Sequence, residues 1–258
     1  MIRDYTMNKF YKKAGMHIIS IFFWLSIWEI LSRTLNADFI FPSIQSTFKA
    51  LIELLGSSLF YRYVAFSLFR VVVGFVLGII FGLICAFLSQ KFEFIHSIIS
   101  PMMSVIKATP VASFIMVLWC FIGGTPVPTV IGALMVSPII YHNMYDALNV
   151  TDSDLAEVCY VFNVQGIRKV RYFLFPRLLE FFIPSAVSGM GLCWKASIAA
   201  EIIAYTKNSI GKEIYNSKVF LEGEKLFAYT LVVILLSLLF ERIMLMLGEV
   251  IKKKCHLK

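Results

Sequence analysis

Long apolar stretches, separated by short polar segments, run along almost the whole chain. A helix needs about 20 mostly apolar residues to cross a bilayer, and six stretches approach or reach that length. The pattern therefore predicts an all-α membrane protein with one integral domain, 16–251, between a tail at 1–15 and a basic tail at 252–258. The predicted spans are Met16–Leu35, Val64–Leu88, Ile98–Ile122, Val127–Leu148, Phe182–Ala204 and Phe227–Ile251. The third span is the weakest, because Pro101, Lys107 and Pro110 interrupt it.

Composition supports a membrane protein and excludes a soluble one. Of the 258 residues, 59% are hydrophobic and 16% are charged, whereas a soluble domain has about 25% charged residues. The net charge of +8 does not indicate nucleic-acid binding, because the basic residues lie in tails and short loops beside apolar spans. These basic residues are explained by their attraction to the anionic headgroups of the lipid bilayer, which anchors the chain in the membrane.

Lysine and arginine also predict the orientation of the chain. Four lie in each of the tail at 1–15, the loop at 151–177 and the tail at 252–258, and none lies in the short loop Gly123–Pro126. Two loops on the opposite side also contain basic residues, which are Arg33, Lys49 and Arg62 in one and Lys207, Lys212, Lys218 and Lys225 in the other. Basic residues remain preferentially on the cytoplasmic side. We therefore expect both termini and the loop at 151–177 to be cytoplasmic in a bacterial-type cell membrane.

Small residues recur at helical spacing in two of the predicted spans. Gly74, Gly78 and Gly82 follow one another at intervals of four, and the fifth span contains Ser185–Gly189 and Ala196–Ala200. Such spacing places small residues on one face of a helix, where another helix can approach closely. We predict helix packing at the three glycines, either static or at a moving interface.

Three ionisable residues within spans are candidates for a translocation path or gate: Lys107, Lys195 and Glu201. Each costs about 2.5–3.5 kcal/mol at the centre of a bilayer on insertion scales. Six residues separate Lys195 from Glu201, which is about 240° around a helix, so each needs its own partner or an aqueous path. The five cysteines form no C-x-x-C pair, and we predict no metal site.

The polar segment between the fourth and fifth spans has the spacing of two short helices joined by a turn. Leu155, Val158, Cys159 and Phe162 follow the i, i+3, i+4, i+7 pattern of an apolar helical stripe. Asn163 and Gly166 tolerate the positive φ angles of a turn. From periodicity alone, this segment could lie on the membrane, pack beneath the helices, or bind in the groove of a partner.

This segment resembles the EAA loop of ABC importer permeases. Glu157-Val158-Cys159 corresponds to E-A-A, Asn163 to the glycine that follows, and Phe173–Pro176 to I-x-L-P. Further landmarks resemble those of the nitrate/sulfonate/taurine-type permeases, across roughly residues 18–252. They are Trp28-Glu29, Phe41-Pro42-Ser43, Ser67–Arg70 with Gly74-Phe75, Lys107–Pro110, Trp194–Glu201 and Ile210-Gly211.

The resemblance implies a type I ABC importer permease (MetI-like) with six transmembrane helices and a cytoplasmic coupling helix. ATPase coupling is then expected at Asp154, Ala156, Glu157, Val158, Cys159, Asn163, Gly166 and Pro176. It also implies ABC ATPase subunits that bind ATP and Mg, a second permease subunit in a homodimer, and an extracytoplasmic solute-binding protein.

The chain has no phosphate-binding G-x-x-x-x-G-K-[ST] loop, which agrees with ATP hydrolysis on a partner. We therefore expect no enzyme activity and no cofactor on this chain. The expected solute is nitrate, a sulfonate, taurine, or a related small anion or vitamin precursor. The alternative is a secondary transporter or channel that works without an ATPase.

Overall fold

The computed structural model describes residues 2–35, 39–149, 168 and 174–254, and all the secondary-structure elements among them are helical. The predicted all-α class is therefore confirmed. The chain divides into two compact units. The first unit comprises residues 1–60 and 213–232, and the second comprises 61–212 and 233–258.

The first unit is built around α1 (Ile2–Leu35) and α2 (Ile44–Leu55). α1 contains the predicted first span. α2 is amphipathic and begins at an N-cap, because the side chain of Ser43 accepts a hydrogen bond from the backbone N–H of Ser46. This cap satisfies one of the N–H groups that a helix start leaves without a partner. Thr47 and Ala50 are the residues that α2 buries.

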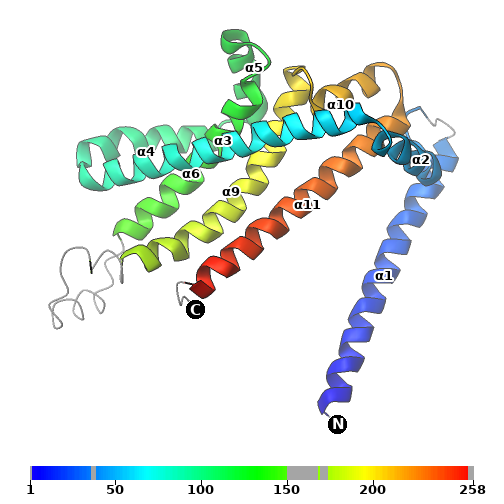
Figure 1. The fold of residues 1–258 in the computed structure, drawn as a ribbon, viewed down its shortest axis with the longest axis horizontal. Helices are drawn as coiled ribbons and strands as arrows, with labels where there is room; N and C mark the ends of the chain where they lie inside the picture. The colour runs from blue at the N-terminus through cyan, green and yellow to red at the C-terminus, as the bar shows by residue number, and fades with distance from the viewer. Residues whose placement is uncertain (1, 36–38, 150–167, 169–173, 255–258) are drawn as a thin grey trace. The chain divides into compact units, whose positions relative to one another are not determined.

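The second unit contains most of the long apolar helices. These are α3 (Ser58–Lys91), which starts in the first unit, α4 (Glu93–Ala108), α5 (Val111–Ile122), α6 (Val127–Asn149), α9 (Phe175–Ile203) and the greater part of α11 (Gly223–Lys254). α6 and α9 run side by side (Figure 1) and share the most extensive contact between helices. Ile131, Val136 and Ile140 of α6 and Met190 and Cys193 of α9 are buried in the common core.

The prediction of one helix over Ile98–Ile122 is wrong. α4 ends at Ala108, α5 begins at Val111, and the two helices are bent by 106° (Figure 1). Pro110 causes the break, because it has no N–H to donate and its ring forces the preceding residue out of the helical region. Thr109 is accordingly extended, with a ψ angle of 134°.

Four helices among the residues described are long and apolar enough to cross a membrane: α3, α6, α9 and α11. The bent pair α4–α5 is a fifth candidate if it counts as one span. The predicted second, fourth, fifth and sixth spans differ from α3, α6, α9 and α11 only at their ends. α1, which contains the predicted first span, is not among the candidates, so the described residues support four or five of the six predicted spans. Two short helices were not predicted, α2 and α10 (Ile210–Val219), because their apolar runs are shorter than a membrane span.

Candidate functional site

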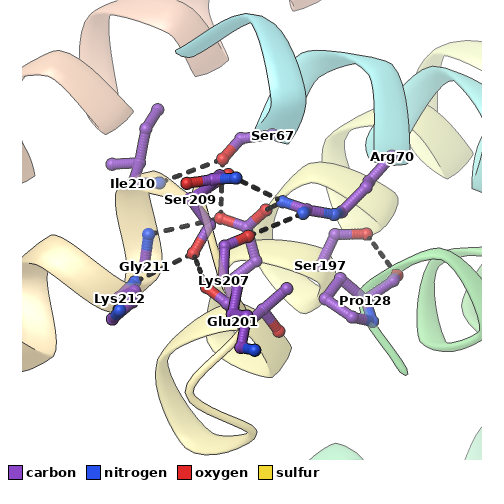
Figure 2. A network of polar contacts seen from close by, with 12 residues as sticks. Ser67, Arg70, Pro128, Ser197, Glu201, Lys207, Ser209, Ile210, Gly211 and Lys212 are labelled. Atoms are coloured by element: carbon purple, nitrogen blue, oxygen red, sulfur yellow. Dashed lines mark hydrogen bonds and ion pairs between the residues drawn. The ribbon is translucent and has the colours of Figure 1, made fainter. Parts of the chain in front are cut away.

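Glu201 lies in the last turn of α9 and is only 1% exposed. Its carboxylate accepts three hydrogen bonds, and none comes from α9 itself. Ser67 Oγ donates at 2.8 Å, Arg70 Nη1 at 3.2 Å and the backbone N–H of Gly211 at 3.2 Å. Figure 2 shows these donors converging on the carboxylate from α3 and from the start of α10. One side chain therefore joins three helices.

Arg70 supplies the positive charge opposite Glu201. Its side chain is 11% exposed, and it also donates to the carbonyl oxygens of two residues that follow α9. Nη1 lies 3.1 Å from the oxygen of Asn208, and Nη2 lies 2.8 Å from the oxygen of Lys207. The planar guanidinium presents its donors in a fixed fork, so it can bind the carboxylate and both carbonyls together.

The segment between α9 and α10 is a tight turn with unusual backbone geometry. Tyr205 and Asn208 have φ angles of 50° and 49°, a region that residues other than glycine seldom occupy. Thr206 Oγ1 donates to the carbonyl of Gly124 at 2.8 Å, which ties this turn to the one between α5 and α6. Several hydrogen bonds therefore hold a turn conformation that Asn208 tolerates but that Tyr205 does not itself favour.

Glycine is required where α10 meets α9. A Cβ atom built on Gly211 would lie 2.4 Å from Glu201 Cβ and 2.7 Å from the backbone nitrogen of Ile202. Ser67 completes the contact, because its hydroxyl also accepts the backbone N–H of Ile210 at 3.0 Å. We refer to Ser67, Arg70, Glu201 and the turn 204–211 as the Arg70–Glu201 network.

The other predicted path residues have different surroundings. Lys195 is exposed on α9, although its neighbour Trp194 is buried and donates to the carbonyl of Val233 at 3.2 Å. Lys107, also exposed, lies at the end of α4 in an open cleft of about 600 Å³. The cleft is lined by Ser104, Lys107, Ala108, His142 and Asp146, and we refer to it as the Lys107 cleft. The structure does not bring Lys107, Lys195 and Glu201 together.

The three glycines at intervals of four on α3 lie against α6. A Cβ atom would lie 2.6 Å from the carbonyl oxygen of Thr129 at Gly74, and 2.8 Å from the carbonyl oxygen of Ala133 at Gly78. At Gly82 it would lie 2.8 Å from the carbonyl oxygen of Ser137. Any side chain here would therefore separate the two helices.

Two further landmarks of the sequence meet in the first unit. Trp28 Nε1 donates to the carbonyl of Pro42 at 3.0 Å, and the Trp28 ring contacts Phe41 and Phe227. Glu29 accepts from Arg33 at 2.9 Å and from the backbone N–H of Ile44 at 3.4 Å. These contacts fasten the end of α1 to the start of α2.

Most of the predicted coupling residues lie outside the described part of the chain. These are Asp154, Ala156, Glu157, Val158, Cys159, Asn163 and Gly166. Pro176 is described, and it occupies the first turn of α9, where a missing N–H costs no helical hydrogen bond. The helices on either side of the loop, α6 and α9, are the two that pack most extensively.

Sequence reasoning missed the pairing in the Arg70–Glu201 network. The sequence placed Arg70 only in a family landmark, Ser67–Arg70, and predicted that Glu201 faces a path or gate. The sequence did contain one indication of the pair. Arg70 and Glu201 are opposite charges in two different apolar stretches, and Ser67 lies one helical turn before Arg70. Ser67 and Glu201 are 134 positions apart, so no local pattern could link them.

The fold defines a class: an all-helical, multi-pass membrane domain with no metal cluster among the described residues. Residues 78–253 match the family of the binding-protein-dependent transport system inner membrane component. The match covers more than half of the chain, and the protein belongs to this family. It is the transmembrane permease of an ABC importer, with a MetI-like domain.

Two relatives support the assignment. A probable ABC transporter permease protein of Haemophilus influenzae is 23% identical over 218 residues, covering 83% of this chain and 87% of the relative. A putative aliphatic sulfonates transport permease protein SsuC of Bacillus subtilis is 21% identical over 210 residues, covering 79% and 74% respectively. The chain is therefore a transport component rather than an enzyme, and the family implies a binding protein and an ATPase as partners in general.

Proposed function

We propose that this permease forms the path for a small solute, that separate ATPase subunits drive it, and that the loop at 151–177 couples the two. The observation that carries the proposal is the position of this loop. It connects the end of α6 at Asn149 to the start of α9 at Phe175. A force applied to the loop acts on both helices of the most extensive contact in the second unit.

The proposed importer has a defined orientation in the membrane and three kinds of partner. The loop and both termini face the cytoplasm, where the ATPase subunits bind ATP and Mg. Two copies of the permease surround the path, and an extracytoplasmic solute-binding protein delivers the solute. The basic loops and the family to which the chain belongs support these assignments.

A small anion is the proposed solute. One relative is named for the transport of aliphatic sulfonates, and nitrate, taurine or a vitamin precursor is the wider class considered. Lys107 and Lys195 are exposed cations in or beside membrane helices, which suits an anion in the path. We assign these two lysines to the path, and we treat the buried Glu201 separately below.

The test of coupling uses the double variant Glu157→Ala, Val158→Ser in the reconstituted permease–ATPase complex. We expect the complex to assemble in the membrane while ATPase activity no longer responds to the solute-loaded binding protein. Gln165→Ala, in the same loop but outside the apolar stripe, is the matched control and should respond as the unmodified protein does. A full response in the double variant would disprove coupling through this stripe.

The same preparation distinguishes the importer from a secondary transporter or channel. Vesicles that contain the permease alone should not accumulate solute, and uptake should require the ATPase, ATP and Mg. Uptake by the permease without an ATPase would favour the alternative class.

A further inference from the structure

The Arg70–Glu201 network has few polar groups left free to exchange partners. The Glu201 carboxylate accepts three donors, Arg70 donates to three acceptors, and the Ser67 hydroxyl both donates and accepts. If α3 separated from α9, a nearly buried carboxylate would lose its counter-charge. Removing one partner of a buried ion pair is far more costly than breaking an exposed one.

The turn within the network has little room to change shape. Gly211 lies so close to α9 that a Cβ atom would overlap Glu201. A Cβ at Gly124, which accepts the hydrogen bond from Thr206, would lie 2.5 Å from the carbonyl oxygen of Ala204. The backbone N–H of Thr206 is itself bonded to the carbonyl of Glu201 at 3.1 Å. These close contacts leave no space for the turn to rotate against α9.

The network also lies at a defined end of the molecule. α9 has 29 residues, which is about 43 Å of helix and more than the hydrocarbon thickness of a bilayer. Its first three residues are the last three of the loop at 151–177, and its last turn carries Glu201. The network is therefore on the membrane face opposite the proposed coupling loop.

We propose that Arg70 and Glu201 form a permanent clamp rather than a gate that opens in each transport cycle. The clamp keeps three parts together as one rigid body: the part of α3 that carries Ser67 and Arg70, the end of α9, and the turn 204–211. Arg70 is the positioning residue, because it alone bonds both the carboxylate and the two turn carbonyls. The proposal rests on the ATPase-driven cycle above and states which part of the permease does not change shape during it.

The test measures the separation between α3 and the turn with a pair of spin labels. Phe69 is 67% exposed on α3, next to Arg70, and Lys207 is exposed on the turn, so Phe69→Cys and Lys207→Cys provide the attachment points. Cys120, which is exposed, and Cys159 and Cys255 are replaced by serine. The buried Cys85 and Cys193 are kept. The dipolar broadening of the two nitroxides reports how far apart they are and how widely that distance varies.

The first measurement needs only the permease in lipid. We expect one narrow distance distribution, and a broad or two-component distribution would overturn the clamp. Arg70→Leu should broaden the distribution strongly. Arg70→Lys should restore it in part, because an ammonium group can pair with Glu201 but lacks the planar fork.

Arg62→Leu is the matched control for this experiment. Arg62 is an exposed arginine two turns earlier on α3, with its guanidinium carbon 5.8 Å from the centre of the Phe66 ring. This variant should leave the distribution unchanged. Equal broadening in Arg62→Leu and Arg70→Leu would show that the effect is general loosening of α3, and would overturn the positioning role of Arg70.

The second measurement repeats the experiment in the ATPase complex, without nucleotide and trapped with ATP. A single label at the exposed Phe175, the first residue of α9, reports whether nucleotide binding reaches the permease. If that label responds and the Phe69–Lys207 distance stays constant, the clamp is supported; if the distance changes, the network is a gate. If the Phe175 label does not respond, ATPase coupling has failed, and the permease-alone measurement decides the clamp.

Discussion

The Arg70–Glu201 network and the Lys107 cleft each place a cation and a carboxylate in the membrane domain, yet their surroundings differ. In the network, Arg70 and Glu201 are 3.2 Å apart and nearly buried. In the cleft, Lys107 and Asp146 are exposed, and they form neither an ion pair nor a hydrogen bond with one another. The comparison shows that a charge in an apolar helix can be structural or accessible to a solute, and that its neighbours decide which.

The difference has a physical basis in the donors and acceptors nearby. The turn after α9 directs two carbonyl oxygens at Arg70, and α10 directs a backbone N–H at Glu201. A buried ion pair is tolerated only when such bonds replace the lost water. The Lys107 cleft is open, so water or a solute can satisfy its charged groups. The network is therefore suited to holding helices together, whereas the charged groups of the cleft remain exposed.

Removing the arginine of the network should have the largest effect on stability. Arg70→Leu leaves Glu201 buried without its counter-charge, and we expect the free energy of unfolding to fall by about 3–5 kcal/mol. Lys107→Leu is the control in the cleft and should change it by less than about 0.5 kcal/mol. Unfolding in mixed micelles measures both variants, and equal losses would remove the distinction between the two regions.

A methyl group at the closest backbone contact of the network should have the next largest effect. Gly211→Ala places a Cβ atom against Glu201 and the backbone of Ile202, and overpacking of this kind costs about 1–3 kcal/mol. Gly191→Ala on α9 is the matched control, because a Cβ there has nothing within 4 Å. The melting temperatures of the two variants measure the difference. Equal destabilisation of Gly191→Ala and Gly211→Ala would contradict the predicted overpacking at Gly211.

Loss of the bridging hydroxyl should be smaller but measurable. Ser67→Ala removes the donor to Glu201 and the acceptor for the Ile210 N–H, at a cost of about 1–2 kcal/mol. Ser104 in the cleft is exposed and bonds only within α4, to the Ser100 carbonyl at 2.9 Å. We expect the stability of Ser104→Ala to be close to that of the unmodified protein in the same unfolding assay.

Neutral replacements in the cleft should have the smallest effect on stability and should affect transport instead. Lys107→Gln and Asp146→Asn should each change the free energy of unfolding by less than about 0.5 kcal/mol. If the cleft binds the solute, Lys107→Gln should reduce uptake of an anion through a weaker apparent affinity. Unchanged uptake kinetics in both variants would remove the cleft from the path.

The long apolar runs predicted α3, α6, α9 and α11 closely, because membrane-spanning helices require length and apolarity, which are local properties. The spacing of Gly74, Gly78 and Gly82 likewise indicated a close helix contact, although it could not name α6 as the partner. The third span was predicted as one helix but is two, α4 and α5. The sequence shows that Pro110 interrupts the helix, but the angle between the two helices depends on the helices around them. α2 and α10 were not predicted because ten or twelve residues are too few to resemble a membrane span.

By itself, the sequence determined that this is an all-helical membrane protein, and its landmarks indicated an ABC importer permease. Only the tertiary structure decided what the charges within those helices do. Lys195 and Glu201 look alike in the sequence, as single charges in one apolar helix, yet one is exposed and the other is enclosed by α3 and α10. The physical reason is distance along the chain. A hydrophobic pattern acts over neighbouring residues, whereas two of the three donors to the buried Glu201 lie on α3, more than a hundred positions away.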